Sequence, residues 1–393
     1  MSKIWNQYEV KKENKTLVLE VIKSRSPISR ADIAKITGLN KGTVSSLTSE
    51  LLDEHLIYES GPGQSSGGRR PLMLLFNHLA GYSIGIDVGV NYLLGILTDL
   101  KGNIVTEKKR LFTELTYEEI LAHIIEIIYD LKLSSENSVY GVVGIGIGVP
   151  GVVSNSGEIL FAPNLGWRNK DLRSSMEQEF NVPITIANEA NAGAYGEKTF
   201  GAGKNEQDII YVSVGIGIGV GLILDDKLYK GNNGLSGEFG HMTIESNGLL
   251  CRCGNQGCWE LYASEQALIK KAKKIDYLAK RDDVTLELLC ELAASGDERI
   301  KNLFSEVGEY LGIGVTNIVN GFNPRKVIIG NRMEIAEQWI RAALELRVNN
   351  NSLRFHRNDV KIDFSHLNSH STALGVAAFS IEKFLEIDVV KVT

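Results

Sequence analysis

Two stretches of the chain repeat one pattern: an apolar strand, a turn containing glycine, and a second apolar strand. The first is GYSIGIDVGVNYLLGILTDL at residues 81–100, and the second is IIYVSVGIGIGVGLIL at residues 209–224. Predominantly apolar runs of this kind are typical of buried strands, and a strand-then-helix pattern follows both. The repeat predicts an α/β fold with two related lobes and a cleft between them.

The order along the chain divides it further. A chain of 393 residues is long enough for two or three units. Residues 1–75 carry 11 Lys and Arg against 8 Asp and Glu, which gives this segment a net charge of +3. Since the whole chain has a net charge of −6, the remainder carries −9. We expect domains at 1–76, 77–190 and 191–375, with a C-terminal helix at 376–393 that returns to the first lobe. No apolar run is long enough to span a membrane and no signal peptide is recognisable, so the expected compartment is the cytoplasm.

The basic N-terminal unit has the pattern of a helix-turn-helix. Apolar residues recur at helical spacing between Asn14 and Ile22; Ser29 can cap a short second helix that Gly38 ends, and Asn40 can cap a third. The inward face of the third helix is then Val44, Leu47, Leu51 and Leu52. An ordinary helical hairpin with a polar face is the alternative.

The residues after the third helix favour DNA binding. Residues 56–58 and LMLLF at 72–76 are expected strands around the loop GPGQSSGGRRP, which makes a wing, although the loop could also be a domain linker. A winged helix-turn-helix places the start of the helix after the turn, here the third helix of the chain, in the major groove. The expected DNA-binding residues are Ser29, Arg30, Lys41, Thr43, Val44, Ser45, Ser46, Thr48, Arg69 and Arg70.

Three of the four cysteines lie within eight positions. Cys251, Cys253 and Cys258, with His241, form a set of three thiolates and one imidazole that suits a structural Zn²⁺ ion. Buried reduced cysteines beside an unrelated histidine are the alternative. Cys290 lies in an apolar helical pattern and is expected in the core.

Two carboxylates flank this loop. Glu238 precedes His241 and Glu260 follows Cys258, and carboxylates of this kind accept hydrogen bonds from paired sugar hydroxyls. Surface carboxylates are the alternative reading of either residue alone.

The motifs together resemble the repressor branch of the ROK family (repressors, open reading frames and kinases), over essentially the full length. The motifs that carry the resemblance are SSGGRRP, Asp87-Val88-Gly89, Gly148-Val149-Pro150-Gly151, Asn188-Glu189-Ala190-Asn191 and GEFGHMTIESNGLLCRCGNQGCWELYAS. The resemblance implies a two-lobed actin-like, sugar-kinase fold behind the winged head. It also implies a sugar pocket lined by Asn164, Asn188, Glu189, Glu238, His241 and Glu260.

The same resemblance argues against phosphoryl transfer, although a ROK-type, ATP-dependent sugar kinase is the alternative function. Kinases of the family carry an Asp where this chain has Glu189 as a vestigial base, and glycine-rich phosphate loops where it has Val90, Ile216, Val220 and Asn331. We therefore expect no catalytic residue and no enzyme activity.

The most similar branch, the bacterial repressors of xylose operons, implies the partners. We expect a homodimer on a palindromic operator DNA, released by D-xylose in the interlobe cleft, with glucose as a competitor for that pocket and no membrane contact.

Overall fold

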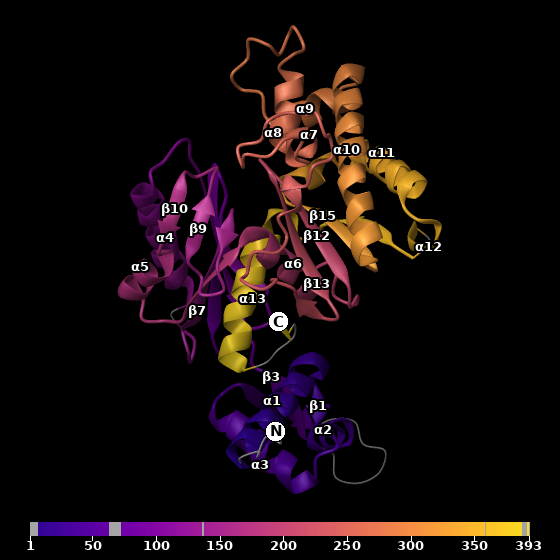
Figure 1. Ribbon diagram of the computed structural model, residues 1–393. Helices are drawn as coiled ribbons and strands as arrows, with labels where there is room; N and C mark the ends of the chain where they lie inside the picture. The colour runs from indigo at the N-terminus through magenta and orange to yellow at the C-terminus, as the bar shows by residue number, and fades with distance from the viewer. Residues whose placement is uncertain (1–6, 63–71, 136, 358, 387–390, 393) are drawn as a thin grey trace.

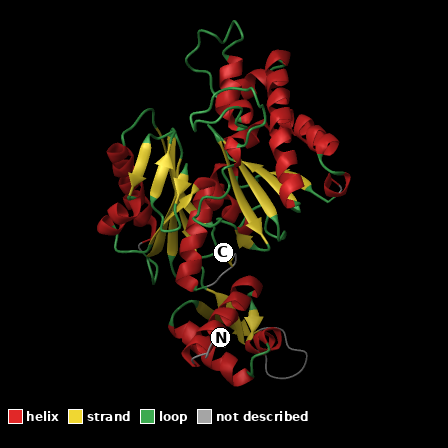
Figure 2. Ribbon diagram, viewed as in Figure 1, coloured by secondary structure: helices red, strands yellow, loops and turns green. Residues whose placement is uncertain are grey.

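The computed structural model describes residues 7–62, 72–135, 137–357, 359–386 and 391–392. Figure 1 shows a small head at one end of the molecule and two larger lobes side by side above it. In each lobe helices flank a β-sheet (Figure 2). Among the described residues, no helix has the length and apolar character needed to cross a bilayer.

The head is a three-helix unit with a small sheet. Its helices are α1 (Gln7–Arg25), α2 (Arg30–Thr37) and α3 (Lys41–Asp53), and its strands, in the order β1-β3-β2, are β1 (Ile28–Ser29), β2 (Ile57–Pro62) and β3 (Leu72–Phe76). Ser29 caps α2, Gly38 ends it in a left-handed conformation, and Asn40 caps α3 through a hydrogen bond from the Thr43 amide. The predicted turn and the predicted pair of wing strands are both present.

The first helix is longer than the sequence pattern predicted. It begins at Gln7, whereas the apolar pattern begins only at Asn14. The pattern missed the first turns because they are mostly polar and exposed or half-exposed, and therefore give no apolar periodicity.

The first lobe is built on a five-stranded sheet in the order β11-β7-β4-β5-β6. Its strands are β4 (Tyr82–Val88), β5 (Tyr92–Asp99), β6 (Ile104–Leu111), β7 (Val142–Val149) and β11 (Ile184–Asn188). A second small sheet contains β8 (Val152–Val153), β9 (Ile159–Ala162) and β10 (Trp167–Lys170), and the lobe's helices are α4 (Tyr117–Lys132) and α5 (Leu172–Glu179). Their buried faces share one apolar core, which includes Ile86, Ile124 and Ile147.

The second lobe repeats the opening hairpin, as the sequence predicted. Its sheet has the order β16-β15-β12-β13-β14-β17. The strands are β12 (Ile209–Val214), β13 (Ile218–Leu224), β14 (Lys227–Leu228), β15 (Lys326–Gly330), β16 (Lys361–Phe364) and β17 (Lys391–Val392). The helices are α6 (Glu189–Thr199), α7 (Glu260–Ala263), α8 (Glu265–Ala272), α9 (Leu286–Ala294), α10 (Glu298–Phe322), α11 (Glu337–Asn351) and α12 (Arg354–Arg357). Short 3₁₀ turns occupy Leu133–Ser135, Phe239–His241, Arg332–Ala336 and Asn368–His370.

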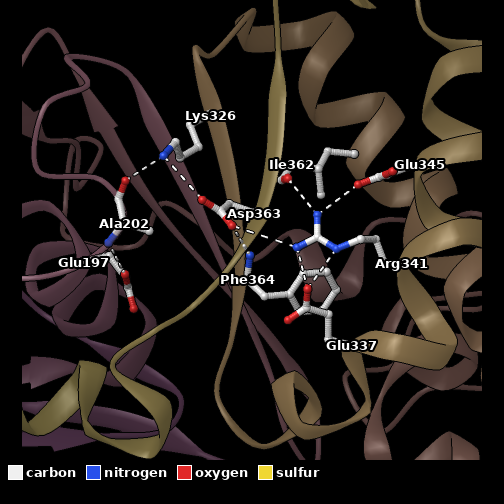
Figure 3. Close-up of polar contacts among 9 residues, drawn as sticks. All are labelled: Glu197, Ala202, Lys326, Glu337, Arg341, Glu345, Ile362, Asp363 and Phe364. Atoms are coloured by element: carbon white, nitrogen blue, oxygen red, sulfur yellow. Dashed lines mark hydrogen bonds and ion pairs between the residues drawn. The ribbon is translucent and has the colours of Figure 1, made fainter.

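Polar side chains tie the edge of this second sheet to its helices (Figure 3). Lys326 Nζ donates to the carbonyl of Ala202 at 2.8 Å and lies 3.5 Å from the Asp363 carboxylate on the neighbouring strand. Arg341 on α11 pairs with Glu337 and Glu345 on the same helix and donates to the carbonyl of Ile362. Short strand β16 is thereby held by charges as well as by its ladder.

The last helix, α13 (Ser371–Leu385), packs on strands β4 and β7 of the first sheet and on α6. The predicted bounds of 376–393 are wrong at both ends, since the helix spans Ser371–Leu385 and Lys391–Val392 form strand β17 beside β14 of the second lobe. Its contact with the first lobe was predicted; its position against α6 was not.

Candidate functional site

The outer face of α3 offers four small or charged polar groups. Lys41, Ser45 and Ser46 are exposed and Thr43 is half-buried. These residues occupy the first turns of the helix, which is the part that enters the major groove in helix-turn-helix proteins.

Two of the predicted DNA-binding residues on the same helix face inward. Val44 and Thr48 are fully buried, and the Thr48 hydroxyl donates to the carbonyl of Val44 at 2.8 Å. Arg30 donates to the Thr48 hydroxyl and forms an ion pair with Glu59 on β2. The predicted DNA contact is therefore wrong for Val44 and Thr48, since the helical period places both against the head's core; Arg30 is a bridge between elements of the head.

The Ser29 side chain, which was also predicted to contact DNA, does not lie on the exposed surface of the head. Its side chain is buried and its hydroxyl is used for the α2 cap, where it donates to the Asp32 carboxylate and accepts from the Asp32 amide. Arg69 and Arg70 at the wing tip lie outside the described residues.

All six residues expected to bind sugar lie around one cavity between the lobes, of about 490 Å³. They come from widely separated parts of the chain: Asn164, Asn188, Glu189, Glu238, His241 and Glu260. Backbone from both glycine-rich hairpins and from the Pro150-Gly151 turn completes the wall. A cavity of this size with several convergent polar groups fits a small polar ligand.

Asn188 has a structural role at this wall. Its amide oxygen accepts from the Asn191 amide at 3.0 Å and so caps α6, and its amide nitrogen donates to the Gly151 carbonyl at 2.8 Å. The cap fixes the position of Glu189, the first residue of the helix, because both belong to the same turn.

Behind Glu189 lies a buried acidic residue, Asp87, whose proximity to Glu189 the sequence pattern did not indicate. Asp87 at the end of β4 accepts a hydrogen bond from the Tyr92 hydroxyl at 2.7 Å. Burial, and to a smaller extent the charge of Glu189, raises the pKa of Asp87 to about 8, while the hydrogen bond from Tyr92 acts in the opposite direction. Burial likewise raises the pKa of Glu189 to about 7, against a hydrogen bond from Ser213. The cavity wall around Glu189 therefore disfavours additional negative charge.

The first glycine turn has a backbone amide that is already occupied by a hydrogen bond within the hairpin. The Tyr92 ring lies directly against Gly89, where it would collide with any Cβ, and the Gly89 amide donates to the Tyr92 carbonyl at 2.9 Å. A backbone amide that is already engaged is not a free donor for a phosphate oxygen. Tyr92 was missed at the sequence level because its role depends on the strand pairing.

The second glycine turn, at Gly215–Gly217, also has a backbone amide that is already hydrogen-bonded. The Gly215 amide donates to the Gly217 carbonyl at 3.0 Å, and Asn331 donates to the Ser213 hydroxyl at 2.9 Å. Asn331 adopts φ +65°, a conformation that favours glycine, and its side chain occupies space beside Gly215 that a glycine would leave open.

The predicted metal ligands converge. One ligand atom from each of His241, Cys251, Cys253 and Cys258 lies within 4.8 Å of all the others. The Cys251 sulfur is 3.6 Å from His241 Nδ1, and the Cys253 and Cys258 sulfurs are 3.7 Å apart. Thiolates about 2.3 Å from a tetrahedral ion would be about 3.7 Å apart, so the four side chains fit a metal ion. Burial raises the pKa of the Cys258 thiol, which leaves a buried sulfur that a cation would stabilise as thiolate.

The metal cluster and the cavity share a wall. Glu260 Oε1 lies 3.3 Å from the Cys251 sulfur and 3.5 Å from His241 Nδ1. His241, Cys253 and Glu260 all line the cavity, so the folded metal loop sets where the Glu260 carboxylate lies. Cys290, by contrast, packs at the margin of the second lobe's core, as predicted.

The fold and this site define a two-lobed, actin-like protein of the sugar-kinase type that carries a helix-turn-helix head. The ROK family profile matches residues 83–383, which covers most of the chain, and the chain belongs to the ROK family. It is 46% identical to the xylose repressor of Bacillus spizizenii over 384 residues, which are 98% of this chain and 99% of that protein.

Two solved structures are informative. A ROK family transcriptional regulator, a homologue of the Escherichia coli MLC protein, matches with a TM-score of 0.81 and 29% identity over 96% of both chains. A ROK family glucokinase from Streptomyces griseus, in complex with glucose and AMPPNP, matches with a TM-score of 0.69 and 30% identity over 76% of this chain and 99% of its own. The match to the regulator thus covers nearly the whole chain, whereas the kinase leaves about a quarter unmatched. The prediction that the chain is not an enzyme is confirmed by these regulatory relatives.

Proposed function

We propose that the protein is a D-xylose-responsive transcriptional repressor that acts in the cytoplasm. A homodimer binds a palindromic operator through the head, and D-xylose in the interlobe cavity releases the DNA. The single observation that carries the proposal is the near full-length match to a xylose repressor, which includes the head and the cavity together.

The DNA contacts would come from the exposed start of α3. Lys41 supplies a cation for a phosphate, and the hydroxyls of Thr43, Ser45 and Ser46 can bond to phosphates or base edges. The predicted contribution of Arg69 and Arg70 at the wing belongs to the same proposal. The net balance of the head is positive while that of the body is negative, which favours approach of DNA to this end of the molecule.

D-xylose would occupy the cavity between the lobes. Glu189, Glu238 and Glu260 offer carboxylate oxygens to vicinal hydroxyls, while Asn164 and His241 offer further polar contacts. A neutral sugar suits a site whose wall holds Glu189 with buried Asp87 nearby, and glucose would compete for the same groups. Structural Zn²⁺ held by the histidine and the three cysteines would fix the Glu260 side of the cavity.

The test begins with operator selection from a random duplex library by the full-length protein. The selected DNA is then titrated at fixed salt, with and without D-xylose, with glucose and D-ribose in parallel. We expect D-xylose to weaken DNA binding at least tenfold and D-ribose to leave it unchanged. If D-xylose binds by calorimetry but operator affinity is the same in its presence, the release mechanism is wrong.

A further inference from the structure

Helix α13 connects the cavity wall to the head. It has 15 residues and is therefore about 22 Å long. Figure 1 shows it, in yellow, running between the two lobes with its C-terminal end directed toward the head. The two ends of this one helix meet different functional parts of the molecule.

The first turn of α13 touches the segments that line the cavity. The Thr372 hydroxyl donates to the Glu189 carbonyl at 3.1 Å, and its methyl group packs on Gly148, next to the Pro150-Gly151 turn. Ala373 and Leu374 pack in one cluster with Tyr92. The start of α13 thus contacts all three segments at the inner end of the cavity.

The middle of α13 lies where the lobes meet. Gly375 packs against the Ala192 carbonyl on α6 with no room for a Cβ, and on the opposite side Gly146 of β7 packs in the same way against the Val376 carbonyl. The Tyr195 hydroxyl of α6 also donates to the Glu382 carboxylate. Contacts this close transmit displacement, because packed backbones cannot absorb a shift by side-chain rearrangement.

The last turns of α13 pack against the apolar core of the head. Ile381 and Leu385 belong to the same apolar cluster as Leu19 of α1 and Leu51 of α3. Phe384 meets the Tyr140 ring edge-on, with centroids 4.9 Å apart.

Tyr140 connects this contact to α3, the helix proposed to enter the major groove. Its hydroxyl donates to the carbonyl of Glu54 at 2.7 Å, and Glu54 is the residue that ends α3. In addition, Lys12 of α1 forms an ion pair at 2.7 Å with Glu386, the residue that ends α13. The head is therefore docked on the body through defined contacts at the end of α13.

We propose that α13 is the element that couples the cavity to the head: a ligand that draws the lobes together moves the start of α13 through Thr372, and the far end of the helix reorients α3 through Phe384 and Tyr140. The inference rests on the proposed function, since it assigns the route by which sugar changes DNA affinity. In energetic terms, sugar and DNA favour different positions of one helix, and the coupling is reciprocal.

Two variants that remove a single hydroxyl test the two ends of the route. Thr372→Val deletes the bond to Glu189 while keeping the side chain's shape, and Tyr140→Phe deletes the bond to the end of α3. Matched controls are Thr316→Val, a buried threonine on α10 bonded within its own helix, and Tyr129→Phe, an exposed tyrosine bonded to Glu179 on α5. Thermal melting checks that each protein is folded.

The readout is the ratio of operator affinities without and with D-xylose. We expect Thr372→Val and Tyr140→Phe each to lower this ratio about three- to tenfold while both controls keep the wild-type value. Calorimetry must show that each variant still binds D-xylose. If the wild type has a ratio above one and neither variant lowers it, the coupling role of α13 is refuted. If the wild type itself has a ratio of one, the proposed function fails instead.

Discussion

Replacing Glu189 by glutamine is predicted to change how stability depends on pH. The pKa of Glu189 is about 7 in the folded protein and 4.5 without burial, so the folded state keeps a proton that the unfolded state releases between these values. For a carboxyl group whose pKa is raised by folding, stability is full below about pH 4.5 and falls as the pH rises through about 7. Glu189→Gln removes the ionisation and should leave a flatter pH profile.

The magnitude follows from the two pKa values. The gap between 4.5 and about 7 corresponds to about 3 kcal/mol of lost stability at high pH. The side chain retains some exposure to the cavity, which screens its charge, so we expect about 2 kcal/mol. At about 2 °C per kcal/mol, the variant should melt about 4 °C above the wild type at pH 8 and close to it at pH 5.

The assay is thermal melting of full-length protein at pH 5, 6, 7 and 8 in matched ionic strength. Glu177→Gln, which neutralises an exposed carboxylate on α5, is the control and should show no growing difference from the wild type. A melting difference for Glu189→Gln that is constant from pH 5 to pH 8, or is larger at pH 5, would refute the argument from burial.

Two further predictions concern the metal cluster and the head. Cys258→Ser should abolish the binding of one equivalent of Zn²⁺, which metal analysis of the purified protein measures. It should also weaken D-xylose binding at least tenfold, because the metal loop no longer holds the Glu260 carboxylate in place. Retained sugar affinity in a metal-free protein would contradict this. Lys41→Ala should weaken binding to all DNA sequences alike and lower the salt dependence by about one counterion, whereas Ser49→Ala, with a hydroxyl bonded to the Ser45 carbonyl, should not.

Residues that act through their immediate neighbours could be assigned from the sequence. The caps at Ser29 and Asn40 and the left-handed turn at Gly38 lie where the pattern placed them, because capping is decided within four residues. The metal ligands also converge as predicted, since three of the four lie in one short loop.

Residues whose role depends on distant partners could not be assigned in this way. The sequence suggests that the Thr48 hydroxyl faces the DNA groove, but in the structure the side chain is buried in the head's core. The sequence likewise identifies Tyr92 only as a strand residue, whereas in the structure its ring covers Gly89. The resemblance to relatives supplied the six cavity residues, but the proximity of buried Asp87 to Glu189 emerged only when two elements were brought together.

The sequence by itself therefore determined the winged head, the two lobes and the metal loop, because strand alternation, helix capping and ligand spacing are local properties of the chain. Only the tertiary structure decided which face of α3 is available, which amides of the two glycine turns are already hydrogen-bonded, and that α13 joins the cavity to the head. Those features depend on close packing between segments that are far apart in the sequence, and no local pattern records such contacts.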